Sequence, residues 1–187
     1  MKKIKNKNVF IKIKRETAKQ REELFDDIML ENNKEIKEKL DKIMKIASNN
    51  IFDWTEENTS IHFHNKDKIN INRIYWNKDG KTIEDRLEKY FKIYVISEDI
   101  EFLLQKIELL IDTEITNAIY KVPKIGLDKL NLDYYFDITN NGCDICVSLA
   151  EDGVEPPYHP SCQCEGELII MDDDENEYNI DVEEVYR

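Results

Sequence analysis

Glycine, proline and long apolar runs are all scarce in this sequence. The chain has only 5 glycines and 4 prolines among its 187 residues, so long disordered or collagen-like segments are not expected. No apolar run approaches the ~20 residues that cross a bilayer, and the first residues lack the apolar core of a secretory signal. We therefore expect a folded protein of the cytosol or of the interior of a virus particle, with no membrane partner.

Positive charge is also scarce, because 27 lysines and arginines stand against 40 acidic residues and leave a net charge of −13. This balance argues against a protein that coats nucleic acid with a generally basic surface. The charges are unevenly placed: residues 1–15 carry seven bases and no acid, whereas residues 165–187 carry ten acids and one base. We expect any DNA contact only through the basic arm at residues 1–15. The two ends either meet different partners or are simply solvated.

Cysteine occurs four times, and all four residues fall between positions 143 and 164. The pattern consists of a Cys-x-x-Cys pair and a later His/Cys cluster: Cys143, Cys146, His159, Cys162 and Cys164. Such a pair followed by such a cluster is typical of zinc ligands, because a tight turn points two thiolates at one ion. Two disulfides or four unliganded thiols are the alternatives. A chain without a secretory segment keeps its thiols reduced, which favours the metal.

The five candidate ligands exceed the four of a closed structural zinc site. We predict a structural Zn²⁺ held by Cys143, Cys146, His159 and one of Cys162 or Cys164, and the spacing leaves the last choice open. A catalytic zinc needs an open coordination position. The surplus of ligands therefore favours a structural role.

The first half of the sequence predicts one long helix. Apolar residues recur at helical spacing from about residue 16 to residue 48, with an interruption at Asn32 and Asn33. We expect this helix to pack on its own domain, the alternative being a helix that projects toward a partner or a second copy. Asn49-Asn50 is expected to end it. Before it, residues 9–13 have the composition of a strand.

Short strands and turns are predicted over residues 51–81. His62 and His64 alternate with apolar residues there, so they lie on one face of a strand. Two histidines on one face can share a metal, but no third ligand is close in the sequence. We expect surface or half-buried histidines.

The second half predicts a helical core followed by strands. We expect a helix from Thr82 through Tyr94 and then a central helix from Glu98 to Tyr120, which Ser97 caps. Pro123 and Gly126 are expected to break the chain after it. A strand at 132–138 and a C-terminal hairpin of 166–171 with 178–182 are expected to follow. The acidic run at 172–176 is interpreted as the solvated turn of that hairpin.

Together these elements predict the α+β class, mainly helical with short β-hairpins and a zinc-knuckle-like C-terminal loop. The expected organisation begins with the basic arm at 1–15 and continues with a long helix and short strands at 16–81. A helical domain at 82–187 follows, and it contains the metal loop at 143–164 and the C-terminal hairpin.

One stretch of the sequence resembles a known family. Asp112-Thr113-Glu114 lies in a predicted helix, and an aromatic strand, the Cys-x-x-Cys pair and the run Pro-Pro-Tyr-His-Pro-Ser-Cys-Gln-Cys follow it. This order resembles the C-terminal domain of the minor head, or head-morphogenesis, proteins of tailed phages, the Mu F-like family. The match covers residues 98–165. It departs from the family at Gln163, where an arginine is usual, and at 139–142, where Asp-x-Arg-Thr is usual.

The resemblance implies a structural or assembly protein of the virion rather than an enzyme. Such proteins lie near the portal, and the expected partners are portal, capsid or neck proteins or a second copy of the chain. The expected location is the virion, and the host cytoplasm during assembly. Two other functions remain open: a zinc-dependent hydrolase or nuclease, which needs an open metal position, and a zinc-finger nucleic-acid binder, which the net charge opposes.

Overall fold

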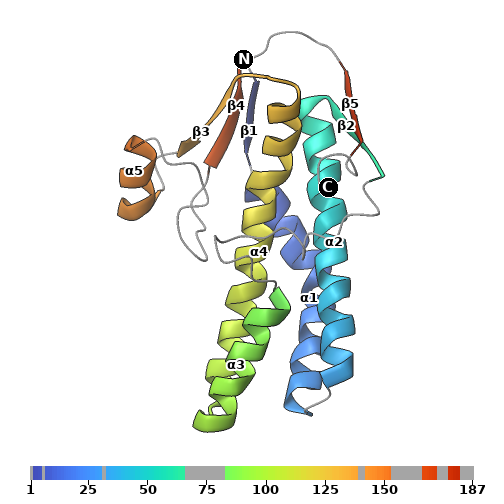
Figure 1. Ribbon diagram of the computed structural model, residues 1–187, viewed down its shortest axis with the longest axis vertical. Coiled ribbons are helices and arrows are strands. Elements are labelled where there is room, and N and C mark those ends of the chain that lie inside the picture. The colour runs from blue at the N-terminus through green and yellow to red at the C-terminus, as the bar shows by residue number, and fades with distance from the viewer. Residues whose placement is uncertain are drawn as a thin grey trace.

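Long helices form the body of the molecule, and two small sheets lie at one end of it (Figure 1). The computed structural model describes residues 2–5, 7–30, 33–65, 83–138, 142–152, 166–171 and 177–181. The helices are α1 (Lys7–Met29), α2 (Asn33–Thr59), α3 (Ile83–Ser97), α4 (Ile100–Lys129) and α5 (Asp144–Glu151). The strands are β1 (Lys2–Lys5), β2 (Ile61–His64), β3 (Tyr134–Ile138), β4 (Gly166–Ile170) and β5 (Tyr178–Asp181). The fold is mainly helical α+β, which confirms the predicted class.

Helix α1 includes residues 9–13, so the strand predicted there is wrong. Val9 and Ile13 fall on the same helical face as Leu24 and Ile28, and all four are buried. Burial of this face at helical spacing outweighs the strand preference of branched side chains in a short window.

The long helix predicted at 16–48 is in fact two helices that lie side by side (Figure 1). The interruption at Asn32 and Asn33 falls where α1 gives way to α2. Asn50 does not end α2, which continues to Thr59. Asn50 is buried against α1, where its side-chain amide donates to Glu16 at 2.8 Å as well as to the carbonyl oxygen of Ile46 at 3.0 Å. Both helices pack within the chain: Ile43 has no exposed surface. The interpretation as a helix packed on its own domain is therefore confirmed.

Helix α4 is the central element, as predicted, but its limits differ from those expected. Its N-cap is Asp99, whose carboxylate accepts from the backbone N–H of Phe102 at 2.9 Å, and not Ser97. At the other end the helix continues through Pro123 and Gly126, where a break was expected. A proline inside a helix costs about 3 kcal/mol, whereas burying an apolar side chain contributes about 1.5–3 kcal/mol. Burial of Val122 and Leu127 in the extended helix offsets that cost.

Close packing explains the glycine in this last part of α4. A Cβ atom at Gly126 would lie 3.0 Å from Cδ1 of Ile61, at the start of β2. Glycine lets the helix approach the strand, and this approach buries Ile61 completely.

The predicted C-terminal hairpin is wrong, because its two strands belong to different sheets. β4 pairs antiparallel with both β1 and β3, in the order β1-β4-β3, whereas β5 pairs in parallel with β2. Leu168, Ile169 and Ile170 are all at most 5% exposed, so β4 is covered on both faces. A strand of this kind belongs at the centre of a sheet, and a two-stranded hairpin would have left one of its faces in water.

A buried ionic cluster joins α1 to α4. Nη1 of Arg21 donates to Oδ1 of Asp112 at 2.7 Å and to Oε1 of Glu108 at 2.8 Å. Lys14 donates to the other oxygen of Asp112 at 2.7 Å, and Nε of Arg21 donates to Thr17 at 3.0 Å. The side chains of Arg21 and Asp112 are only 6% and 8% exposed. Each charge therefore depends on the other for its stability in the core.

None of the described helices is long and apolar enough to span a membrane.

Removal of one partner from this cluster should be costly. We expect Asp112→Ala to lower the free energy of unfolding by about 1.5–3 kcal/mol, because buried Arg21 loses its buried carboxylate and keeps only the partly exposed Glu108 as an ionic partner. The matched control is Glu88→Ala, whose ion pair with Lys92 is exposed and should contribute less than about 1 kcal/mol. Urea unfolding followed by circular dichroism measures both values. Equal losses in the two variants would contradict the buried role of Asp112.

Candidate metal site

The first two predicted zinc ligands are brought together at the start of α5. Cys143 is the N-cap of this helix, with an extended backbone (φ −71°, ψ 158°), and Cys146 lies in its first turn. An extended N-cap turns its side chain over the first turn of the helix, where the third helical residue lies. The two Sγ atoms are consequently 3.4 Å apart.

This distance fits a shared metal ion. Zinc–sulfur bonds of about 2.3 Å in a tetrahedral site place two sulfur ligands about 3.8 Å apart, whereas a disulfide joins its sulfur atoms at about 2.05 Å. A thiol–thiol hydrogen bond also accounts for 3.4 Å. The pair is therefore preorganised for one ion but does not itself identify the occupant.

The three remaining candidates, His159, Cys162 and Cys164, lie outside the described residues. Among the residues that are described, no group of three His, Cys, Asp or Glu side chains is placed to hold a metal. The acidic run at 172–176 also lies outside them.

Sheet pairing nevertheless constrains the two ends of the cysteine-bearing segment. Ile138, the last residue of β3, is the register partner of Gly166, the first residue of β4. Cys143 follows Ile138 by five residues, and Cys164 precedes Gly166 by two. The described ends of this segment therefore meet at one end of the sheet.

Helix α5 has very little apolar burial of its own. Cys146 is its one buried residue, with no exposed surface, while Ile145 is 59% and Val147 39% exposed. The helix lies beside β3, apart from the four long helices (Figure 1). Burial this small contributes little to fixing the helix in place, so the cysteine pair is the feature of α5 best able to anchor it.

The two histidines of β2 are placed as the sequence predicted. Ile61 and Phe63 are buried on one face of this strand, while His62 is half-buried and His64 exposed on the other. Nε2 of His64 lies 3.0 Å from Oδ1 of Asn179 on β5. A neighbouring strand therefore supplies a hydrogen-bond partner for the ring.

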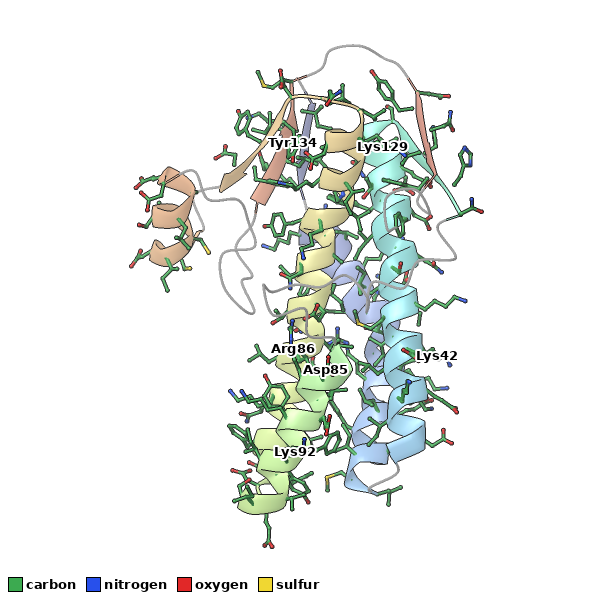
Figure 2. The ribbon with its side chains drawn as sticks, in the orientation of Figure 1. Lys42, Asp85, Arg86, Lys92, Lys129 and Tyr134 are labelled. Atoms are coloured by element: carbon green, nitrogen blue, oxygen red, sulfur yellow. The ribbon has the colours of Figure 1, made fainter. Side chains whose placement is uncertain are left out.

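The Asp112-Thr113-Glu114 stretch lies in the buried middle of α4. These three residues are between 4% and 6% exposed. Asp112 faces Arg21 of α1, whereas Glu114 accepts a hydrogen bond from Nη1 of Arg86. Figure 2 shows Arg86 on α3, which lies beside α4. The two carboxylates thus link the central helix to two different neighbours.

Sequence reasoning missed Arg21 and Arg86 as partners. A signal for Arg21 was present, because it shares the buried face of α1 with Ile13, Thr17 and Leu24. A charged residue on an otherwise buried face indicates an opposite charge on the element packed against it.

Burial shifts the pKa values of Glu114 and Lys121, which lie on α4. Burial raises the pKa of Glu114, and the nearby charges of Arg86 and Lys121 oppose that rise. Burial likewise lowers the pKa of Lys121, an effect that Glu114 opposes.

The fold and the cysteine pair define a helical protein with a preorganised thiol site. Comparison of the chain with protein-family models, with curated proteins and with solved structures gives no match. The resemblance described above therefore rests on the sequence motif alone.

The pKa of Glu114 makes a signed prediction about stability. Because the folded pKa lies above the ordinary value of 4.5, the folded state keeps a proton that the unfolded state has already lost. The stability that protonated Glu114 contributes is therefore lost as the pH rises from the pKa of Glu114 in the unfolded state to its pKa in the folded state. We expect Glu114→Gln to gain in stability relative to the unsubstituted protein as the pH rises from about 4 to about 8.

The control for this measurement is Glu23→Gln on α1. Its hydrogen bond with Lys39 lowers the pKa of Glu23, so the sign is opposite: the contribution of Glu23 is lost as the pH falls. Urea unfolding at several pH values compares the two variants. Parallel trends in the two variants would show that burial of Glu114 does not govern the effect.

Proposed function

We propose that this protein is a structural or assembly component of a tailed-phage particle, a minor head, portal-associated or neck protein that acts by binding other virion proteins. The observation that carries the proposal is the pair of sulfur atoms 3.4 Å apart on α5. They lie in a segment whose two ends start from paired positions of one sheet. This arrangement agrees with the metal-clamped C-terminal part that the Cys/His spacing predicts, in the same stretch of sequence that carries the family resemblance.

The clamp is a structural zinc ion held by Cys143, Cys146, His159 and one of Cys162 or Cys164. It would supply the stability that α5 lacks, since structural zinc contributes about 10–16 kcal/mol in finger peptides. Whole domains are stable by only about 5–15 kcal/mol. Loss of the metal would therefore release α5 and the chain on either side of it.

The buried Asp112-Thr113-Glu114 stretch supports the family assignment from a second direction. In the resemblance these residues belong to a helix that precedes the cysteines, and here that helix is the centre of the core. Their charged neighbours are Arg21 and Arg86, which come from α1 and α3. The polar residues thus contribute to holding the helices together, as expected for an assembly protein that presents a fixed surface.

Zinc content tests the clamp. We expect one zinc per chain, lost in Cys143→Ser, Cys146→Ser and His159→Ala and kept in the control His64→Ala. Of Cys162→Ser and Cys164→Ser, only the variant that removes the fourth ligand should lose the metal. X-ray absorption should show four protein ligands, which leaves no open position for a hydrolase or nuclease. The clamp would be refuted if the purified protein contained no metal and a chelator left its unfolding curve unchanged.

Particle composition tests the virion role separately. In the phage or prophage that encodes the chain, we expect mass spectrometry of gradient-purified particles to detect it. Deletion of its gene should reduce infectious particles, and a plasmid copy should restore them. The Cys146→Ser variant should restore fewer particles than the His64→Ala control, since the metal clamp is lost in the first alone. Particles that form with normal yield and infectivity without the chain would contradict the assignment.

A further inference from the structure

Strand β3 lies at an edge of its sheet. The order β1-β4-β3 places β4 between the other two, and within the described parts of the chain β3 pairs with β4 alone. An edge strand presents a row of backbone N–H and C=O groups that can pair with a further strand. Helix α5 lies beside this edge (Figure 1).

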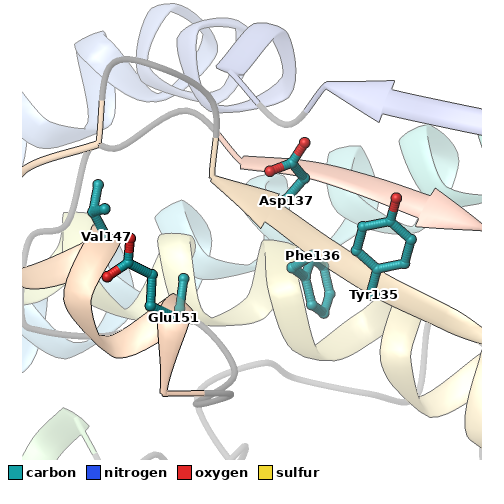
Figure 3. Close-up of a pocket in the computed structure, with 6 residues that line it drawn as sticks. Tyr135, Phe136, Asp137, Val147 and Glu151 are labelled. Atoms are coloured by element: carbon teal, nitrogen blue, oxygen red, sulfur yellow. The ribbon is translucent and has the colours of Figure 1, made fainter.

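A pocket of about 310 Å³ opens between β3 and α5 (Figure 3). Its lining residues are Tyr135, Phe136 and Asp137 from the strand and Val147, Ala150 and Glu151 from the helix. Successive side chains of a strand point to opposite faces. Three successive residues of β3 therefore line one pocket where the edge of the strand, and not only one of its faces, borders that pocket.

The side chains around the pocket divide into fixed and accessible groups. Phe136 packs edge-to-face on Tyr120 of α4, with ring centroids 5.2 Å apart, and so belongs to the core side of the sheet. Tyr135 and Asp137 point to the opposite side (Figure 3). Tyr135 is 48% exposed and Val147 39% exposed, so both offer apolar surface to a ligand.

The charge of the pocket has one sign. Asp137 and Glu151 are the carboxylates among its described lining residues, both are exposed, and no described lysine or arginine lines it. Among the described residues, neither carboxylate takes part in an ion pair. A lysine or arginine side chain of a ligand would complement both carboxylates.

We propose that the groove between β3 and α5 binds an extended, lysine- or arginine-bearing segment of a partner protein, which adds to β3 as a further strand. Its main chain pairs with the β3 edge, and a basic side chain lies between Asp137 and Glu151. Apolar side chains at alternate positions pack on Tyr135 and Val147. Main-chain pairing supplies affinity and the alternating side chains supply specificity in this mode of recognition.

The chain's own lysine-rich strand is already engaged elsewhere. β1 pairs with β4 at the opposite edge of the same sheet, where Lys5 also lies 3.5 Å from Glu167. β1 is therefore not available to occupy the β3 edge. This inference does not depend on the virion role or on the identity of the metal.

The test uses the protein as purified and a fluorescein-labelled peptide of alternating lysine and valine, about eight residues long, enough for one strand. We expect saturable binding by fluorescence anisotropy. The double variant Asp137→Asn/Glu151→Gln should weaken it by about tenfold or more. Ala150→Phe, which fills the pocket, should weaken it similarly. The charge-matched control Glu38→Gln/Glu57→Gln on α2 should bind within about twofold of the unsubstituted protein.

Two further peptides separate strand addition from simple charge attraction. A peptide methylated on alternate backbone nitrogens loses its N–H donors and should bind at least about tenfold more weakly. A glutamate–valine peptide should not bind. Equal weakening in the two double variants would overturn the proposal, because the attraction would then be nonspecific. Undiminished binding of the methylated peptide would also overturn it, because the backbone would then not be paired.

Discussion

The charges buried on α4 impose the constraint on which the rest of the helical body depends. Residues 110–120 of this helix are buried on every side, yet Asp112 and Glu114 lie among them. Neither carboxylate is stable there without an opposite charge. Arg21 from α1 and Arg86 from α3 supply those charges, so each outer helix has one favourable position along α4. Apolar contacts alone tolerate small slides between helices, whereas these pairs do not.

The three-stranded sheet imposes a second constraint on α4, at Tyr120. Phe136 of β3 packs on Tyr120, which ties the sheet to the same central helix. Register pairing of Ile138 with Gly166 then fixes both exits of the cysteine-bearing segment. The described ends of the cysteine-bearing segment, Ile138 and Gly166, are therefore positioned by helix packing through the sheet.

The sequence predicted the helical class, the central position of α4 and the strand at Tyr134–Ile138, because strong periodicity and aromatic content are local signals. It could not predict that β4 pairs with β1 and β3, since pairing over such separations leaves no local pattern. It also placed breaks at Asn50 and Pro123, where tertiary burial overrides local preference. At the candidate site, the spacing of Cys143 and Cys146 predicted their proximity correctly. The position of Arg21 on the buried face of α1 was the signal that could have indicated a carboxylate partner.

The pairing of β1 with β4 has a consequence for the order of events during synthesis. Lys2–Lys5 are synthesised well before their sheet partners, which lie at Glu167–Ile170. At about 5–20 residues per second, that first strand waits roughly ten to thirty seconds for its neighbour to appear. The antiparallel helices α1 and α2 are complete long before then. They can shield their apolar faces against each other while the sheet edge is still missing, so the helical body can act as the scaffold on which the later strands assemble.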